Sequence, residues 1–353
     1  MNNLLSDQLY IEDLAYVSGL TLPWELLKGR SIMISGATGM IGSFLIDVIM
    51  YKNRTDSLNC HIYGLGRSME KASVRFSEYM DAEEFDFIEC DITRPVEGVN
   101  AETVDYVLHL ASNTHPEAYA KDPIGTITAN VFGTYNLLEW AADHNAKRFA
   151  LASSNEIYGE NRGDDELFDE KYCGYIDCNT LRAGYPESKR CSEALCQAYI
   201  RQKNMDIVIP RLTRSYGPTL LPTDTKALSQ FINKALAGQN IVLKSRGTQY
   251  YSYCYTADSV AGLLYVLLKG ECGEAYNIAD EASDIRLKDL AGLVAEYAGT
   301  QVVFELPSET EAAGFSKATK ARLNGNKLKA LGWQMKYDIK SGIERTMEIM
   351  GGR

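Results

Sequence analysis

The chain has 353 residues, a length that suits two lobes or one large α/β unit. Of these residues, 45% are hydrophobic and 24% are charged, a composition typical of a globular protein. Its formal net charge of −11 at pH 7 argues against general binding of nucleic acid or of an anionic membrane, because like charges repel. There is no apolar run of about 18 residues and no secretory signal, so we expect neither a membrane span nor export.

Cysteine spacing also bounds the class of protein. The eight cysteines include no CxxC pair, the spacing that metal sites and redox motifs usually require. We therefore expect free thiols in a reducing cytoplasm and no metal site.

The first half of the chain alternates short apolar runs with helical patterns. Residues 7–28 are expected to form short amphipathic helices, and an apolar strand at Ile32–Ile34 then runs into a glycine-rich loop and an apolar helix. Further buried strands are expected within CHIYGLGRS, FDFIECDIT, VDYVLHLAS and RFALASS, with a helix through IGTITANVFGTYNLLEWAADH. This alternation predicts an α/β fold with a doubly wound parallel sheet.

After about residue 170 the alternation loosens, but helices and one strand are still expected. The strand lies in IVIPRLTRSYGP, and the helices lie in ALSQFINKALAG, SVAGLLYVLLKG, LKDLAGLVAEYAG and KLKALGW. No low-complexity linker separates the two parts. We therefore expect two lobes packed together, with the chain crossing between them more than once.

The loop after the first strand has the pattern GxxGxxG. Gly36 permits the tight turn, Gly39 lets backbone amides approach a pyrophosphate, and Gly42 lets the helix lie close to the strand. The positive end of the helix then faces the phosphates. A glycine-rich turn without a ligand is the alternative, but the strand–loop–helix context favours a dinucleotide site.

The end of the second expected strand should contact the adenosine ribose. An acidic residue there would bind the 2′-hydroxyl of NAD, whereas this chain has Gly66 and Arg67. Arg67 could pair with a 2′-phosphate, which slightly favours NADP, or it could be a solvated surface side chain. Asp91, at the end of the third strand, suits the adenine amine. The choice between NAD and NADP stays open.

Tyr185 and Lys189 form a YxxxK pattern, which places both side chains on one helix face. We expect the ammonium to lower the pKa of the phenol, which can then act as acid or base at a carbinol oxygen, with Ser154 bonding the same oxygen. A second YxxxK, Tyr265–Lys269, lies in an apolar helix and is interpreted as core plus cap.

Several stretches together resemble a known family. The glycine loop, HLAS, ANVFGTYNLLE, SSNEIYGE, YPESK, PRLTRSYGP, YCYTADSV, EAYNIAD and LGW occur in the order found in extended short-chain dehydrogenase/reductases, the NAD-dependent epimerase/dehydratase family of nucleotide-sugar enzymes. The resemblance implies an enzyme with a Rossmann-type domain, mainly residues 1–175 with an N-terminal helical extension, and a smaller C-terminal lobe for the nucleotide sugar, mainly residues 176–353. It also implies a homodimer.

The resemblance assigns roles to individual residues. It implies a bound nicotinamide cofactor that oxidises the sugar at C4 and is reduced and reoxidised in one cycle, with catalysis by Ser154, Glu156, Tyr185 and Lys189. Its implied cofactor contacts, in addition to Tyr185, Lys189 and the residues derived above, are Thr38, Met40, Ile41, Ile92, Leu110, Ala111, Ser112 and Asn130.

The triplet Ser154-Asn155-Glu156 bears on the reaction. LASNTHPEAYAKDPIGTITANVFGT and LRAGYPESKR look most like UDP-glucuronate decarboxylases, and Glu156 is shared by that branch and the 4,6-dehydratases. Dehydratases have an aspartate where this chain has Asn155. We expect a decarboxylase or 4,6-dehydratase; a 4-epimerase and a non-catalytic NAD(P)-binding protein remain alternatives.

Two positions depart from the family pattern in the expected substrate site. Arg214 replaces an asparagine before YGP, and Tyr251 replaces an arginine before YTAD that often contacts a substrate phosphate or carboxylate. A diphosphate needs basic partners, so another cation should compensate. The expected substrate-binding residues are Ser112, Asn155, Arg211, Arg214, Lys226 and Arg246.

Overall fold

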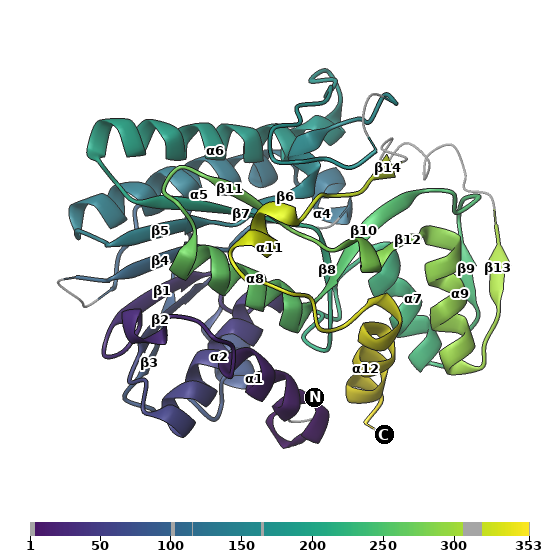
Figure 1. Ribbon diagram of the computed structural model, residues 1–353, viewed down its shortest axis with the longest axis horizontal. Helices are drawn as coiled ribbons and strands as arrows, with labels where there is room; N and C mark the ends of the chain where they lie inside the picture. The colour runs from purple at the N-terminus through teal and green to yellow at the C-terminus, as the bar shows by residue number, and fades with distance from the viewer. Residues whose placement is uncertain (1–3, 100–102, 115, 164–165, 306–319, 353) are drawn as a thin grey trace.

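A parallel sheet of eight strands forms the larger lobe of the protein (Figure 1). The structure is a computed structural model that describes residues 4–99, 103–114, 116–163, 166–305 and 320–352. The strands are β1 (Ser31–Ser35), β2 (His61–Gly66), β3 (Phe85–Glu89), β4 (Tyr106–His109), β5 (Arg148–Leu151), β6 (Ser153–Ser154), β7 (Ile207–Leu212) and β11 (Ala275–Ile278).

The order of the strands is β11-β7-β5-β4-β1-β2-β3, with β6 paired to β7, and every pairing in this sheet is parallel. The order reverses direction between β1 and β4. In open sheets of this kind, ligands bind at that point, beyond the carboxyl ends of the strands.

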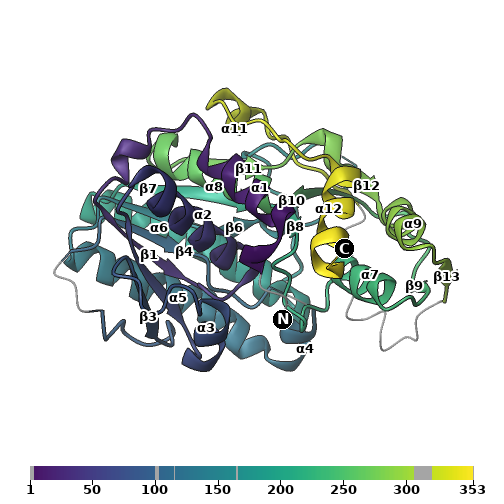
Figure 2. The same ribbon diagram turned by 90° about the horizontal axis from the view of Figure 1, so that it is seen from below.

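Alternating side chains bury both faces of the sheet. Ile32 and Ile34 of β1 join the core beneath α1 (Gln8–Ser18), α2 (Met40–Asp56) and α8 (Thr256–Lys269), whereas Met33 joins the core beneath α5 (Pro123–Asp143) and α6 (Gly184–Lys203). Figures 1 and 2 show these helices covering opposite faces. Both faces are apolar because helices cover both, the arrangement typical of parallel sheets. Two shorter helices, α3 (Met69–Arg75) and α4 (Pro116–Lys121), complete this lobe.

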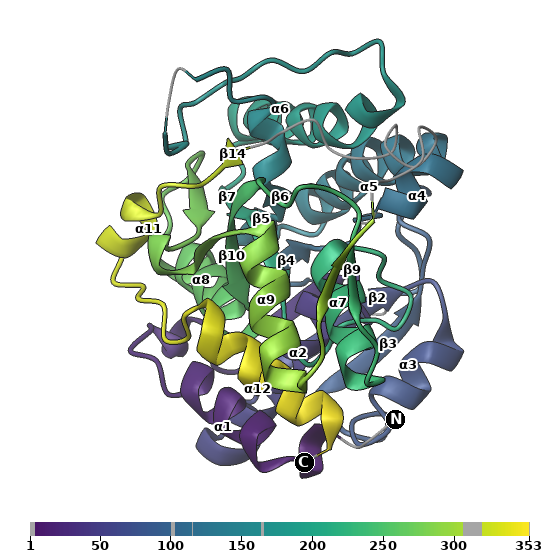
Figure 3. The same cartoon turned by 90° about the vertical axis from the view of Figure 1, so that its right-hand side faces the viewer.

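The second lobe is built around a smaller four-stranded sheet (Figure 3). It contains β8 (Arg214–Tyr216), β10 (Tyr250–Tyr255), β12 (Asp284–Arg286) and β14 (Lys320–Ala321), and β9 (Ile241–Leu243) pairs separately with β13 (Val302–Phe304). Its helices are α7 (Ala227–Leu236), α9 (Leu287–Ala298) and α12 (Ile339–Gly351), whereas α11 (Asn326–Ala330) packs against β11 and α8 of the larger lobe. The chain leaves the large sheet after β7 and returns to it at β11, so residues beyond 176 contribute strands to both lobes.

The N-terminal helix α1 connects the two lobes. The Asp13 carboxylate accepts hydrogen bonds from Tyr255 Oη of β10 at 2.5 Å and from Arg345 Nε of α12 at 2.7 Å. On the other side, Tyr10 Oη donates to Asp47 of α2 at 2.5 Å. Burial raises the pKa of Asp13, and the Tyr255 and Arg345 contacts oppose that shift. The extension therefore ties the second lobe to the first through buried, charge-assisted bonds.

The predicted fold class is confirmed: helices flank a parallel, Rossmann-like sheet. The strand expected at Ile32–Ile34 extends one residue further in each direction. Within the described ranges, no helix is both long and apolar enough to cross a membrane.

Candidate active site

The glycine loop has the geometry of a pyrophosphate cradle. Gly36 has φ +72°, and a Cβ there would lie 2.8 Å from the backbone of Ala111, while one at Gly42 would lie 2.4 Å from the Gly36 carbonyl oxygen. Gly39 is the N-cap of α2 and supplies no side-chain cap, so no side chain competes with a ligand for the first amides of the helix. The bare backbone of the loop can therefore lie close to an anionic dinucleotide, and the positive end of the α2 dipole would favour its phosphates.

The remaining loop residues lie where the two lobes meet. Thr38, Met40 and Ile41 are half-buried at the start of α2. Thr219 Oγ1, from the segment after β8, donates to the Met40 carbonyl oxygen at 2.9 Å. The second lobe thus contacts the first turn of the helix on which the phosphates would rest.

Two predicted adenosine contacts lie at neighbouring strand ends. Arg67 is exposed after β2, and Asp91 is exposed after β3, where its carboxylate accepts hydrogen bonds from the amide and hydroxyl of Thr93 at 3.0 and 2.9 Å. These bonds and the charge of Arg67 lower the pKa of Asp91. Ile92, next to it, is buried against Gly133 of α5.

A chain of hydrogen bonds fixes the end of β4 against α5 and α6. Ser112 Oγ donates to Asn130 Oδ1 at 2.7 Å, and Asn130 Nδ2 donates to Ser188 Oγ at 2.9 Å. The amides of Leu110 and Ala111 donate to Ser35 Oγ at 3.1 and 3.2 Å. The predicted cofactor residues of this strand end are thereby held rigidly beside the glycine loop.

Tyr185 lies at the start of α6, facing the hydroxyl groups at the end of the sheet. Burial raises its pKa to about 12, the charge of Glu156 adds to the shift, and hydrogen bonding by Ser154, the charge of Arg182 and hydrogen bonding by Ser112 oppose it. Ser112 and Ser154 therefore lie near the Tyr185 phenol. A buried phenol among hydroxyl groups is suited to exchange a proton with a carbinol.

Lys189 lies one helical turn beyond Tyr185 on α6 and is anchored on the end of the sheet. Its Nζ donates to the Ala152 carbonyl oxygen at 2.9 Å, and burial lowers the pKa of Lys189 to about 8. Desolvation of Tyr185 dominates the net shift of its pKa, and the expected lowering of that pKa by the Lys189 ammonium stays a prediction.

Glu156 is held by an arginine that the sequence analysis did not single out. Arg182 Nη2 donates to both carboxylate oxygens of Glu156, at 2.6 and 2.5 Å. The guanidinium also lies over the ring of Tyr119, 4.8 Å from its centroid, and that ring stacks on Tyr185 at 4.9 Å. The Glu156–Arg182 ion pair thus packs on the Tyr119 ring, and that ring packs on the reactive phenol of Tyr185.

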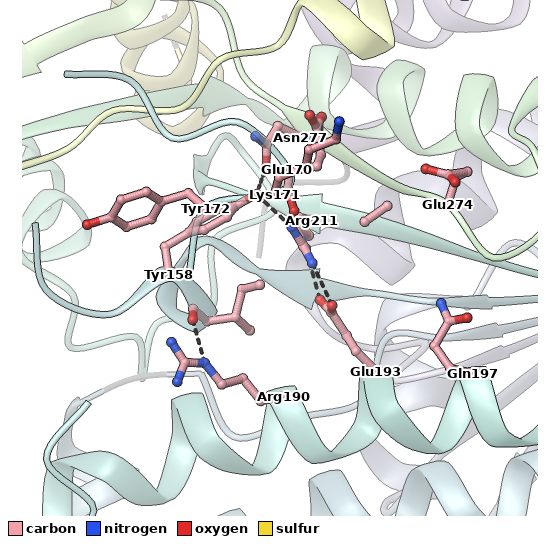
Figure 4. A network of polar contacts seen from close by, with 12 residues as sticks. Tyr158, Glu170, Lys171, Tyr172, Arg190, Glu193, Gln197, Arg211, Glu274 and Asn277 are labelled. Atoms are coloured by element: carbon pink, nitrogen blue, oxygen red, sulfur yellow. Dashed lines mark hydrogen bonds and ion pairs between the residues drawn. The ribbon is translucent and has the colours of Figure 1, made fainter. Parts of the chain in front are cut away.

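Arg211, a predicted substrate residue, is engaged in a buried internal network (Figure 4). It forms a two-point ion pair with Glu193 at 3.0 and 2.7 Å, and its Nη1 donates to Tyr158 Oη at 2.9 Å and to the Glu170 carbonyl oxygen at 2.7 Å. Tyr158 Oη in turn donates to Asn277 Oδ1 at 2.6 Å. Four of the five guanidinium donors are thus used inside the protein. Arg211 therefore joins Glu193, Tyr158 and the Glu170 carbonyl within the fold.

The other predicted substrate residues occupy different settings. Lys226 is paired with Asp224 at 3.0 Å, Arg246 is exposed after β9, and Asn155 is buried in the turn that follows β6. Arg214 lies on β8 with its guanidinium 3.6 Å from the centroid of the Tyr251 ring.

Sequence reasoning missed Arg182 and Tyr119 as members of the site. Arg182 precedes Tyr185 by three residues, which is a local signal that could have been used, because residues three apart share a helix face. Tyr119 had no such signal, since it reaches Tyr185 from another helix. The second YxxxK lies elsewhere: Tyr265 is buried in α8 and Lys269 donates to the Leu331 carbonyl oxygen.

Comparison with known proteins identifies the family. The sequence profile of the NAD dependent epimerase/dehydratase family matches residues 32–279, which include the glycine loop and the Tyr185–Lys189 pair. The chain belongs to this family. The resemblance drawn from the sequence is confirmed, and with it the prediction of an NAD-dependent enzyme of epimerase/dehydratase type.

Curated relatives point in the same direction. UDP-glucuronic acid decarboxylase 5 of Arabidopsis thaliana is 30% identical over 315 residues, which cover 88% of this chain and 86% of the relative. UDP-glucuronic acid decarboxylase 1 of Xenopus tropicalis is 28% identical over 319 residues, covering 90% and 71%.

Solved structures show the same fold. The dTDP-glucose 4,6-dehydratase DesIV of Streptomyces venezuelae, with NAD bound, superposes with a TM-score of 0.76 at 22% identity, over 91% of this chain and 96% of that one. The UDP-glucuronic acid 4-epimerase of Bacillus cereus, in complex with UDP-glucuronic acid and NAD, has a TM-score of 0.75 at 22% identity, over 91% and 99%.

Proposed function

We propose that the protein binds NAD(P) and a nucleotide sugar, oxidises the sugar transiently at C4, and acts as a lyase, with decarboxylation of a nucleotide uronate as the first candidate reaction. The observation that carries this proposal is the buried Tyr185 phenol, faced by Ser154 and Ser112 beside the glycine loop. The relatives named UDP-glucuronic acid decarboxylase support the choice of substrate.

The chain supplies proton transfer and orientation. Tyr185, as the phenolate, accepts the proton of the sugar 4-hydroxyl while Ser154 orients that oxygen, and Lys189, anchored on the Ala152 carbonyl oxygen, positions the cofactor ribose. A nicotinamide cofactor, which the glycine loop and Lys189 would hold, would supply reversible hydride transfer at C4 when bound. The 4-ketone makes a C5 carboxylate a β-keto acid, so the C5–carboxylate bond breaks, CO2 leaves, and the enolate is protonated at C5.

Dehydration is the second candidate, because Glu156 lies beside Tyr185. A base at C5 and an acid for the departing hydroxide are both needed for elimination. Asn155 occupies the position where an acid would stand, and an amide cannot donate its proton to a leaving hydroxide. The geometry therefore supports decarboxylation over elimination, and a 4-epimerase remains the alternative if Glu156 has no role in turnover.

Three finer features belong to the same proposal. Arg67 at the end of β2 supports use of NADP as well as NAD, although the solved relatives contain NAD. The eight free thiols support a cytoplasmic location. Exposed apolar side chains on α5, namely Ile124, Ile127, Phe132 and Tyr135, support a homodimer, which light scattering of the purified protein would test.

One experiment tests the reaction. The protein is incubated with NAD or NADP and with UDP-, dTDP-, CDP- and GDP-linked glucose and glucuronate, and products are identified by mass and chromatography. A loss of about 44 mass units indicates decarboxylation, about 18 indicates dehydration, and an isomer of unchanged mass indicates epimerisation. Normal cofactor binding without turnover of any sugar would contradict the proposal and favour a non-catalytic NAD(P)-binding protein.

A matched pair of variants locates the chemistry. Tyr185→Phe should lower turnover by about 10²- to 10⁴-fold with little change in cofactor affinity, because only the proton-transfer group is removed. Tyr265→Phe makes the same change in the second YxxxK and should leave turnover unchanged. Equal rates for wild type and Tyr185→Phe would refute the assignment.

A further inference from the structure

Arg214 and Tyr251 form a tight stack in the second lobe. Arg214 pairs with Tyr253 across β8 and β10, and its guanidinium carbon lies 3.6 Å from the centroid of the Tyr251 ring. Tyr251 is 7% exposed and Tyr253 is 4% exposed, so the stack is set into the lobe. The contact covers the face of the guanidinium, whereas its N–H donors lie in its plane and are not used by a stacked ring.

Arg214 has no anionic or carbonyl partner in the part of the chain that the structure describes. No hydrogen bond or ion pair joins its guanidinium to another described residue, and its Nη1 is buried without an acceptor. Arg211, three residues earlier, has four of its donors satisfied. Keeping a desolvated guanidinium without an acceptor is costly, and a bound oxyanion would remove that cost.

The stack lies close to the reactive phenol. Burial raises the pKa of Tyr251, the charge of Arg214 opposes the shift, and the charges of Glu156 and Arg182 also act on it. The same Glu156 and Arg182 charges act on Tyr185. Leu212, two residues before Arg214, is paired with Ser154 at the end of the large sheet, so Arg214 follows closely on the strand end that carries Ser154.

We propose that Arg214, held flat against Tyr251, binds an oxyanion of the nucleotide-sugar substrate and makes the site select for it. This inference rests on the proposed function. The oxyanion is either the sugar carboxylate or the diphosphate, both of which match the planar fork of a guanidinium. Tyr251 is a positioning residue that fixes the plane of the guanidinium by a cation–π contact.

Binding measurements on the NAD-loaded protein test the proposal. Wild type, Arg214→Gln and Arg214→Lys are titrated calorimetrically with UDP, UDP-glucose and UDP-glucuronate. A carboxylate contact predicts that Arg214→Gln weakens UDP-glucuronate alone by about 10- to 100-fold, and a diphosphate contact predicts the same loss for all three ligands. Arg214→Lys should recover part of the affinity, because it restores the charge but not the planar fork.

The matched control is Arg286→Gln. Arg286 lies over the ring of Tyr250, 5.1 Å from its centroid, and Tyr250 precedes Tyr251 on β10, so the two rings point to opposite faces. This variant removes a similar arginine–tyrosine stack and should leave all three affinities unchanged. Equal losses in Arg286→Gln and Arg214→Gln would overturn the proposal.

The role of Tyr251 has its own readout. Tyr251→Phe keeps an aromatic ring and should bind like wild type, whereas Tyr251→Leu should weaken the Arg214-dependent ligand by about 3- to 30-fold. A Tyr251→Leu protein that binds normally would overturn the positioning role. Unchanged affinities in Arg214→Gln would overturn the oxyanion assignment alone. A wild type that binds none of the three ligands would overturn a UDP-sugar as the substrate, and absence of turnover with every sugar of the four-nucleotide panel would overturn the proposed function itself.

Discussion

His109, at the end of β4, is expected to make the protein less stable in acid. Ser35 Oγ, which accepts the amide hydrogens of Leu110 and Ala111, also hydrogen-bonds His109 Nδ1 at 2.8 Å. Burial lowers the pKa of His109 to about 3, and the charge of Lys189 adds to the shift. The folded protein therefore keeps this ring neutral where the unfolded chain protonates it.

The size of the effect follows from the two pKa values. Between the unfolded value of 6.5 and the folded value of about 3, the unfolded chain binds one more proton than the folded chain. Stability then falls by about 1.4 kcal/mol per pH unit as the pH falls, or about 2 kcal/mol between pH 7.5 and 5.0. Asp258 and Asp284, whose pKa values burial raises to about 6, act in the opposite direction and reduce the slope of the wild-type curve.

A difference measurement isolates the histidine. The free energy of unfolding in urea is measured from pH 7.5 to 5.0 for wild type, His109→Asn and His109→Gln. Each substitution lowers the free energy of unfolding by an amount that does not depend on pH, and it removes the group whose protonation destabilises the wild type in acid. The difference in unfolding free energy between wild type and each variant should therefore narrow by about 2 kcal/mol from pH 7.5 to pH 5.0. Stability curves that stay parallel across this range would refute the reasoning.

Two further substitutions test the buried network and the loop. Arg211→Met should lower the free energy of unfolding by about 3–5 kcal/mol, because it leaves the Glu193 carboxylate without its cationic partner. The affinity of the folded variant for the nucleotide sugar should not change. A fall in affinity without a fall in stability would instead make Arg211 a substrate residue. Gly42→Ala should lower both the melting temperature and the NAD affinity, because the added Cβ would meet the Gly36 carbonyl oxygen. The control is Gly292→Ala, where no atom lies within 4 Å of the added Cβ, so this change should be neutral or stabilising by about 1 kcal/mol. Equal melting temperatures for the two variants would contradict the close approach of Gly42 to the Gly36 carbonyl.

Local patterns were sufficient to predict the sheet, the glycine loop and the helix that carries the reactive pair. A strand, three glycines and a helix in sequence fix backbone geometry within about a dozen residues, so Gly36, Gly39 and Gly42 could be placed without knowledge of the rest. The spacing of Tyr185 and Lys189 determines that they share a face of α6. Whether each predicted site residue contacts cofactor or substrate stays a prediction.

Only the tertiary structure decided which partner each charged side chain has. The sequence offered Arg211 and Arg214 as equal candidates, yet folding brings Glu193 and Tyr158 to the first and an aromatic ring to the second. It also sends the Lys189 ammonium to a backbone carbonyl. Periodicity specifies which face of an element is buried, but it does not specify which distant element covers that face. Desolvation and pairing, and therefore the pKa values at this site, depend on that covering element.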